Sequence, residues 1–374
     1  MRATTPRDSL RPLGFALVAV GTAALFSPGA CYHGTDDVPL ATGGSGGSGG
    51  APGGASTAST SSSGQGTTSS AGGAGGGHDA GAGTGGASAD PTGVFVAVGY
   101  GARRLRSIDD GMTWVDDTSL EPDGGGDDDY LLRTVVWGQP GFVGLGWRSM
   151  TSPDGSAWTD HGANIGQWLG GAVYANGQFV AVGGYGMRAV STDGVTWVNH
   201  SIDTIATHAG DGLVYADVMG GRYVSANDNG QRSYSSDALT WTYSTGVTTT
   251  LTTHLAFGNG IFLGVGGTAV VTSSDGGTTW TAATSLAVAA DGLVYAAGQF
   301  TAVASGHVYR SANGTSWVDQ PVSGLQGGAL AYGHGTYVMV SGSGVQRSTD
   351  GVTWQAPVES GINSLQWVTF GAIQ

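Results

Sequence analysis

Short apolar runs separated by glycine turns dominate the chain from about residue 92 to its end. In each repeat an aromatic residue opens one run, as in Phe179-Val-Ala-Val182, and most of these runs follow a second apolar run that ends in a glycine turn. Such runs predict short β-strands, and Asn-Gly or Asp-Gly turns supply the positive φ angles that tight hairpins need. The aromatic positions form a column of seven: Phe95, Phe142, Phe179, Tyr223, Phe262, Phe300 and Tyr337.

A second column consists of tryptophans, each preceded by a short serine- and aspartate-containing turn, as in Ser191-Thr-Asp-Gly-Val-Thr-Trp197. Successive tryptophans lie 37 to 44 residues apart. Each unit is therefore expected to hold four short strands, and seven such units predict a seven-bladed β-propeller of the all-β class. The seven tryptophans are Trp114, Trp158, Trp197, Trp241, Trp280, Trp317 and Trp354.

The two ends of the repeat region are expected to share one blade. The first unit starts at Gly93 and lacks an innermost strand, while an apolar run at 365–370 follows the last tryptophan. We therefore predict that this C-terminal strand completes the first blade and closes the ring, which leaves no open blade at the ends of the array.

Before the propeller, which is assigned to residues 92–374, the chain differs in character. Arg2, Arg7 and Arg11 precede an apolar stretch over 13–26, which is shorter than the roughly 20 residues of a bilayer span. This arrangement is typical of a signal peptide. Residues 32–91 are mostly Gly, Ser, Ala and Thr, a composition that cannot bury enough apolar surface to fold, so we expect a disordered linker.

The residues that follow the apolar stretch resemble a bacterial lipoprotein signal. Gly29 and Ala30 match the small positions of its lipobox, and Cys31 follows them. The resemblance implies that residues 1–31 are a signal peptide, that Cys31 is acylated, and that the protein is exported to the cell envelope and held at a membrane only by its lipid. A secreted protein cleaved nearby and an uncleaved membrane anchor are the alternatives.

The repeated turn resembles the Asp-box, which is found in sialidases, in sortilin-type receptors and in the photosystem II stability and assembly factor family. The copies at 107–114 and 273–280 match its pattern in full, and the other five are one residue shorter. The resemblance implies a propeller and leaves the function open. The side chains at its aspartate position, one of them an asparagine, are expected to be structural acceptors of backbone N–H groups: Asp109, Asp154, Asp193, Asp237, Asp275, Asn313 and Asp350.

Composition excludes several classes of function. One cysteine excludes a disulfide framework and a cysteine-rich metal site. A net charge of −14, with 13 arginines and no lysine, argues against a nucleic-acid partner. We expect no cofactor and a monomer. One acidic loop, with Asp123, Asp127, Asp128 and Asp129, is either a weak Ca²⁺ candidate or a solvated loop.

Catalysis by a sialidase-like or other glycan-cleaving mechanism is the alternative to binding. The chain has only two glutamates, Glu121 and Glu359, and lacks the early Arg-Ile-Pro motif that the sialidases carry. Glycoside hydrolysis usually needs two carboxylates that flank one bond. We therefore expect no catalytic residue, with a glycan-cleaving hydrolase and an envelope assembly factor kept as alternatives.

The remaining candidates lie on the propeller face opposite the box turns. Aromatic and arginine side chains there suit the recognition of sugars, carboxylates or protein side chains. The sequence thus predicts an exported, surface-tethered binding or scaffold propeller with an unidentified glycan or protein ligand. Its candidate ligand-binding residues are Tyr100, Arg103, Trp147, Arg148, Tyr185, Arg188, Asn227, Asp228, Arg232 and His307.

Overall fold

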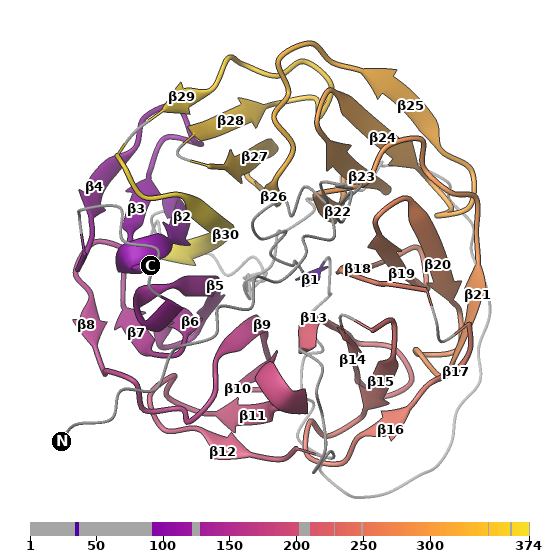
Figure 1. Ribbon diagram of the computed structural model, residues 1–374, viewed down its shortest axis with the longest axis horizontal. Helices are drawn as coiled ribbons and strands as arrows, with labels where there is room; N and C mark the ends of the chain where they lie inside the picture. The colour runs from indigo at the N-terminus through magenta and orange to yellow at the C-terminus, as the bar shows by residue number, and fades with distance from the viewer. Residues whose placement is uncertain are drawn as a thin grey trace, which may run out of the picture.

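The computed structural model is a ring of seven antiparallel four-stranded sheets arranged around a central axis (Figure 1). It describes residues 34–36, 92–121, 128–201, 210–227, 229–247, 250–342, 344–359 and 361–373. The prediction of an all-β, seven-bladed propeller is confirmed. The predicted signal peptide with Cys31 and nearly all of the predicted linker lie outside the described residues.

The blades are numbered 1 to 7 around the ring, and the strands of each blade are named from the innermost to the outermost. Blade 1 consists of β30 (Leu365–Ile373), β2 (Thr92–Gly99), β3 (Arg104–Ser107) and β4 (Val115–Thr118). Blade 2 consists of β5 (Leu132–Gly138), β6 (Gly141–Gly146), β7 (Ser149–Ser152) and β8 (Thr159–Asp160). Blade 3 consists of β9 (Leu169–Ala175), β10 (Gln178–Gly183), β11 (Arg188–Ser191) and β12 (Val198–Asn199). Blade 4 consists of β13 (Gly210–Ala216), β14 (Arg222–Asn227), β15 (Arg232–Ser235) and β16 (Thr242–Tyr243).

The remaining three blades follow the same order. Blade 5 consists of β18 (His254–Gly258), β19 (Ile261–Gly266), β20 (Ala269–Ser273) and β21 (Thr279–Ala282). Blade 6 consists of β22 (Gly292–Ala296), β23 (Gln299–Ala304), β24 (His307–Ser311) and β25 (Val318–Pro321). Blade 7 consists of β26 (Ala329–Gly333), β27 (Thr336–Ser341), β28 (Gly344–Ser348) and β29 (Val358–Glu359).

A few short elements lie outside this pattern. In blade 5, β17 (Thr245–Gly246) pairs in parallel with the outer strand, and β1 (Gly34–Asp36), from the segment expected to be a linker, pairs in parallel with the inner strand. Three 3₁₀ turns are η1 (Tyr100–Ala102), η2 (Asp128–Tyr130) and η3 (Gly184–Gly186). No helix in the described part of the chain is both long and apolar enough to cross a bilayer.

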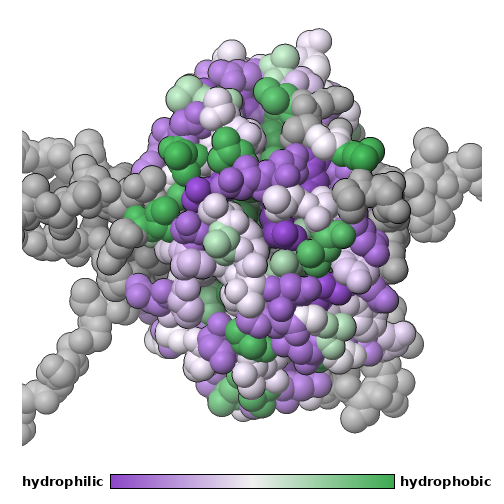
Figure 2. All heavy atoms as spheres, turned by 90° about the vertical axis from the view of Figure 1, so that its left-hand side faces the viewer, coloured by the Kyte–Doolittle hydropathy of each residue, from purple (hydrophilic) through white to green (hydrophobic). Residues whose placement is uncertain are grey.

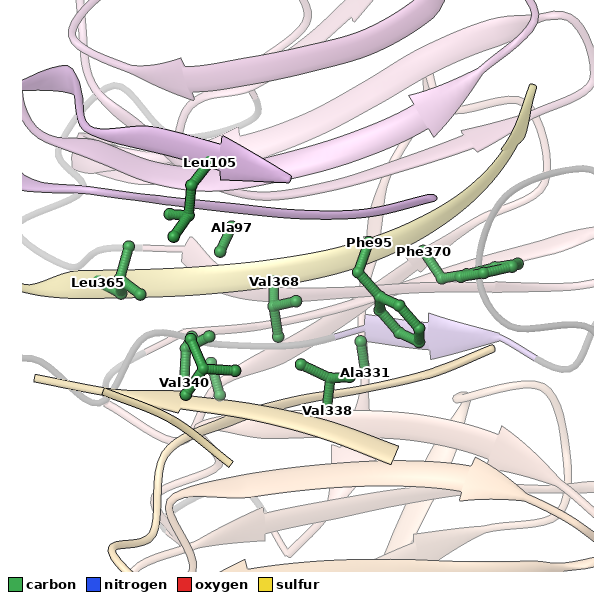
Figure 3. Packing of buried hydrophobic residues seen from close by; sticks show 11 residues of the cluster. Phe95, Ala97, Leu105, Ala331, Val338, Val340, Leu365, Val368 and Phe370 are labelled. Atoms are coloured by element: carbon green, nitrogen blue, oxygen red, sulfur yellow. The ribbon is translucent and has the colours of Figure 1, made fainter. Parts of the chain in front are cut away.

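The C-terminal strand closes the ring, as predicted. β30 pairs antiparallel with β2 from Thr92↔Ile373 to Gly99↔Leu365, so the two ends of the repeat region form one sheet. Figure 3 shows Phe95 and Val368 of this blade pointing toward Val338 and Ala331 of blade 7. Burial of apolar surface between blade 7 and blade 1 therefore stabilises the closed ring.

The core lies between blades rather than within them. Each of the seven buried apolar clusters combines residues of two neighbouring blades. The aromatic column of the second strands pairs with an aromatic residue of each inner strand, with ring centroids 4.5 to 4.9 Å apart. A glycine or alanine follows each inner-strand aromatic: at Gly333 a Cβ atom would overlap the ring of Phe370 in the next blade.

The outer strands limit unwanted pairing at the rim. They are two to four residues long, and β25 ends in Pro321 while β4 carries two aspartates. Short, charged or proline-containing edges are poor templates for strand addition. Seen from the side that carries β4 and β8, the described surface is polar with scattered apolar side chains (Figure 2).

Candidate functional site

The antiparallel order of each blade gives the propeller two different faces. The turn between the first and second strands and the turn before the outer strand lie on one face, which we call the box face. The turn between the second and third strands and the connection to the next blade lie on the other face, which we call the loop face. The described residues among those proposed as ligand-binding from the sequence lie in, or directly beside, loop-face segments.

The polar side chains of the box turns form hydrogen bonds within their own turns. The Ser107 hydroxyl donates to Asp109 Oδ1 at 2.8 Å, and the Thr113 N–H donates to the same oxygen at 2.8 Å. Burial alone would raise the pKa of Asp109, but the hydrogen bonds from Thr113 and Ser107 outweigh it and hold that pKa below its ordinary value. In Asp193, the N–H groups of Thr196 and Val195 lower the pKa. These carboxylates are ionised acceptors within their own turns.

The other box positions show the same arrangement. The pKa values of Asp154, Asp237, Asp275 and Asp350 are also lowered, and each of these carboxylates accepts a hydrogen bond from the serine two residues before it. In blade 6, the Asn313 amide oxygen accepts the N–H groups of Thr315 and Ser316 at 3.0 and 2.9 Å. A neutral amide oxygen therefore satisfies the same backbone donors as a carboxylate.

Two arginines proposed as ligand-binding, Arg188 and Arg232, are buried between blades, each with only 1% of its surface exposed. The Arg188 guanidinium donates to Ser225 and Ser233 of the next blade at 3.2 and 2.9 Å and lies over the Trp241 ring. Arg232 donates to Thr252 Oγ1 and to the carbonyls of Gly230, Val247 and Thr250, and lies over the Trp280 ring. Both side chains join neighbouring blades and are not available at the loop-face surface.

Arg103 and Arg148 are also buried, but each reaches the loop face through an ion pair. Arg103 donates to both oxygens of Asp117, at 2.9 and 2.8 Å, and to the carbonyl of Asn363. Arg148 donates to Asp160 at 2.6 Å and its guanidinium lies 4.2 Å from the centroid of the Tyr130 ring. Their charges are therefore neutralised by carboxylates of the same chain.

The aromatic candidates are more accessible and belong to consecutive blades. Tyr100, Trp147 and Tyr185 stand in the loop-face turns of blades 1, 2 and 3; the first two are half-buried and Tyr185 is 62% exposed. Two further half-buried aromatics, Tyr130 and Trp168, precede the inner strands of blades 2 and 3. We call these residues the aromatic arc: Tyr100, Tyr130, Trp147, Trp168 and Tyr185.

Contacts between the loops connect parts of the arc. The turn η1, which starts at Tyr100, contacts η2, which ends at Tyr130. The Gly184 N–H donates to the Trp168 carbonyl at 2.9 Å, and a side chain at Gly184 would meet the Trp168 ring. Gly184 directly precedes Tyr185, so the turn that carries the exposed tyrosine is fixed against the tryptophan.

Tyr185 has the largest side chain of the described non-glycine residues with a positive φ angle. Its φ angle is +54°, in the left-handed region, and the equivalent residue in blade 1 is Gly101, with φ +64°. A bulky side chain disfavours this conformation, which glycine adopts freely. Blade 3 therefore holds a large exposed aromatic at a position where the fold alone would favour glycine, and such outliers concentrate at functional sites.

The opposite half of the loop face lacks these side chains. The turn between the second and third strands is Gly267-Thr268 in blade 5 and Ser305-Gly306 in blade 6, and Gly342 follows the second strand of blade 7. A shallow depression between blades 6 and 7 is lined by Ser305, Leu325, Gln326, Ser341 and nearby glycines. The bulky loop-face side chains are thus concentrated on one side of the ring.

Sequence reasoning missed the residues at the inner edge of the arc. In blades 1 to 4 one extra residue bulges from the loop-face end of the inner strand: Gln366, Arg133, Gly170 and Asp211. Bulges redirect side chains and are frequent beside functional sites. The Arg133 guanidinium lies 4.4 Å from the centroid of the Trp168 ring. A search of the connections that precede the inner strands and of the first residues of those strands, and not only of the turns within blades, would have found Trp168 and Arg133.

The other candidates are placed as follows. Asn227 is buried, and Asp228 lies outside the described residues. His307 Nδ1 is 2.8 Å from Asp319 Oδ1, and its ring is stacked on that of Tyr309. In the acidic loop, Asp123 and Asp127 lie outside the described residues, as does the side chain of Asp128. Asp129 is exposed, and the described residues contain no group of three or more potential metal ligands.

One carboxylate outside the boxes has a clearly altered acidity. Burial raises the pKa of Asp291, which precedes the inner strand of blade 6, while a hydrogen bond from the Ser305 N–H opposes the change. Glu121 is partly buried beside η1, and the side chain of Glu359 is not among the described ones. Asp291 belongs to no group of three or more potential metal ligands among the described residues.

The fold defines the chain as a seven-bladed β-propeller. No protein-family model matches the chain, and no curated protein matches it. A solved structure described as "YCF48 bound to D1 peptide" is similar, with 16% sequence identity and a TM-score of 0.41; the match covers 70% of this chain and 77% of that chain.

Proposed function

We propose that this propeller is a non-catalytic binding module that takes its partner on the aromatic arc of the loop face. Tyrosine and tryptophan supply large contact area at low entropic cost and dominate the binding energy of many interfaces. The observation that carries the proposal is Tyr185, a 62% exposed aromatic held at positive φ in a turn that packs against Trp168. The fold requires no tyrosine there, so recognition is the better reason for its presence.

Two exposed aliphatic residues extend the arc in blade 1. Leu120 is 41% and Ile362 is 74% exposed. The Leu120 N–H donates to the Gly101 carbonyl, and Asn363, next to Ile362, donates from its side chain to the Glu121 carbonyl. Both apolar residues therefore lie beside η1 and Tyr100. An apolar surface of this kind is stabilised when a protein covers it, whereas a hydroxyl-rich glycan gains less.

We further propose that the module is displayed outside the cytoplasm, with Cys31 acylated. The lipobox-like segment Gly29-Ala30-Cys31 supports this proposal. Metabolic labelling with a fatty-acid analogue tests it. Label on the wild-type chain and none on Cys31→Ser is the expected result, and equal labelling of both chains would contradict it.

A quantitative comparison of variants tests the binding role. The full chain, a Tyr100→Ala/Trp147→Ala/Tyr185→Ala variant and a box-face control, Met219→Ala/Leu239→Ala, are each used to enrich proteins from solubilised envelope. Their melting curves are compared first. We expect one species that the wild type and the control enrich equally and that the arc variant loses by at least about tenfold. Equal enrichment by all three chains would exclude the arc as the binding surface.

A further inference from the structure

The propeller has many more acidic than basic residues. Residues 92–374 contain ten arginines, 22 acids and no lysine, which gives a net charge of −12. Five of the ten arginines are buried: Arg103, Arg104, Arg148, Arg188 and Arg232.

The other five arginines are also engaged within the chain. Arg106 pairs with Asp116, and Arg310 and Arg347 donate to carbonyls of Asp350 and Asp110. Arg133 lies over Trp168, and Arg222 lies over Tyr234. Every arginine of the propeller thus contacts a carboxylate, a carbonyl or a ring of its own chain.

A surface with this charge balance favours a partner of positive net charge. The acids outnumber the arginines, so the long-range field is negative and attracts cations while it repels acidic proteins. Beside the arc, Asp117 and Asp160 balance Arg103 and Arg148, and the exposed Asp129 next to Tyr130 offsets the charge of Arg133. The local charge of the arc therefore does not reverse the general negative field.

The arc also shows how it would hold a cationic side chain. The chain itself stacks guanidinium groups on arc rings twice, with Arg148 4.2 Å from the Tyr130 ring centroid and Arg133 4.4 Å from that of Trp168. Such cation–π contacts are favourable and prefer arginine. Tyr185 is the most exposed ring of the arc and can offer the same contact to another molecule.

Resting on the proposed binding role, we propose that the partner of the arc is a basic protein segment that combines arginine or lysine with aliphatic side chains. The cationic groups stack on the exposed rings within the negative field, and the aliphatic groups cover Leu120 and Ile362. A binding mode of this kind depends on both charge and aromatic area, so it weakens with salt and with loss of the rings.

A pair of labelled peptides tests this inference. One alternates arginine and leucine over eight residues, and the other has glutamate in place of arginine. We expect only the basic peptide to bind the full chain, with an affinity that falls at least about fivefold between 50 and 300 mM salt. Tyr185→Ala should weaken binding at least about threefold, while Tyr185→Phe and the box-face control Leu239→Ala should not.

Three results would overturn the inference. They are equal binding of both peptides, binding of the basic peptide that no arc variant weakens, and binding of the soluble glucan laminarin through the arc in place of either peptide. The first or third result, together with loss of the envelope partner in the arc variant, would leave the proposed binding role standing and refute only the basic partner. Failure of the proposed function itself would appear as an envelope partner that the arc variant retains.

Discussion

Arg347 in blade 7 donates a hydrogen bond from Nε to the backbone carbonyl of Asp110 in blade 1 at 2.9 Å, although 237 residues separate the two. The equivalent arginines of blades 1 and 6 make the same contact with the next blade: Arg106 donates to the Asp154 carbonyl at 3.1 Å, and Arg310 to the Asp350 carbonyl at 2.7 Å. The junction that closes the ring therefore uses the same contact as junctions between consecutive blades.

Because closure depends on β30, removal of residues 363–374 should abolish cooperative folding. The truncation exposes the inner edge of β2 and removes Trp367, Val368 and Phe370 from two interblade clusters. Calorimetry of the truncated chain should show no sharp transition, whereas a chain that lacks only Gln374 should melt like the wild type. A normal transition for the truncated chain would show that the ring does not need its C-terminal strand.

The box turns should tolerate amides better than alanine. Asp193 Oδ1 accepts the N–H groups of Val195 and Thr196, both at 2.8 Å, and Asn313 fulfils this role in blade 6. Asp193→Ala should lower the free energy of unfolding by about 1–2 kcal/mol, because two backbone donors lose their acceptor, and Asp193→Asn by about half of that or less. Denaturant titration of both variants measures the difference. An equal loss in the two would mean that charge, rather than hydrogen bonding, stabilises the turn.

His254, at the start of the inner strand of blade 5, should make stability pH-dependent. The side chain is fully buried, and burial lowers its pKa from 6.5 to about 4, while a hydrogen bond with the Ala290 backbone opposes the change. Between these two values the unfolded chain binds a proton that the folded chain does not. The free energy of unfolding should therefore fall as the pH drops from about 6.5 to 4, by up to about 3 kcal/mol from this group.

Urea titrations of the wild type and of His254→Gln across this range check the effect. The wild type should lose stability steadily between pH 6.5 and 4, and the difference between the two proteins should shrink toward the acid end. Parallel curves would mean that His254 does not change its protonation on unfolding in this range.

Replacing Tyr185 with glycine should abolish partner binding without lowering the stability of the fold. Since Tyr185 has φ +54° and Gly101 occupies the equivalent position in blade 1, Tyr185→Gly should leave the melting temperature unchanged or raise it, by about 1 kcal/mol or less in free energy. The same variant should lose partner binding. A clear drop in melting temperature would instead show that the tyrosine ring stabilises the folded chain, and would remove the main support for a recognition role.

The architecture was predictable because it repeats. Two columns, exemplified by Phe179 and Trp197, recur seven times in the sequence, and the apolar run at 365–370 matches the strand absent from the first unit. The residues of the arc were only partly predictable. Tyr185 stands in a turn that is recognisable from its glycines, whereas Trp168 precedes a strand and meets that turn through a hydrogen bond and packing with Gly184.

The arginines show the limit of reasoning from residue type. Arg103 and Arg188 follow similar glycine-rich turns, and the sequence places both on the loop face. Their roles differ because of partners that are distant in sequence: Arg188 donates to Ser225 and Ser233 of the next blade, and Arg103 to the Asn363 carbonyl. Neither contact could be read from local patterns.

Site-specific photo-crosslinking in living cells tests the central claim most directly. A photoreactive phenylalanine analogue is placed singly at Tyr100, Trp147 or Tyr185, at Thr268 or Gly306 in the opposite half of the loop face, and at Leu239 on the box face. We expect one common adduct from the three arc positions and little or none from the other three. Adducts that form mainly at Thr268, Gly306 or Leu239, with none at the arc, would contradict that claim.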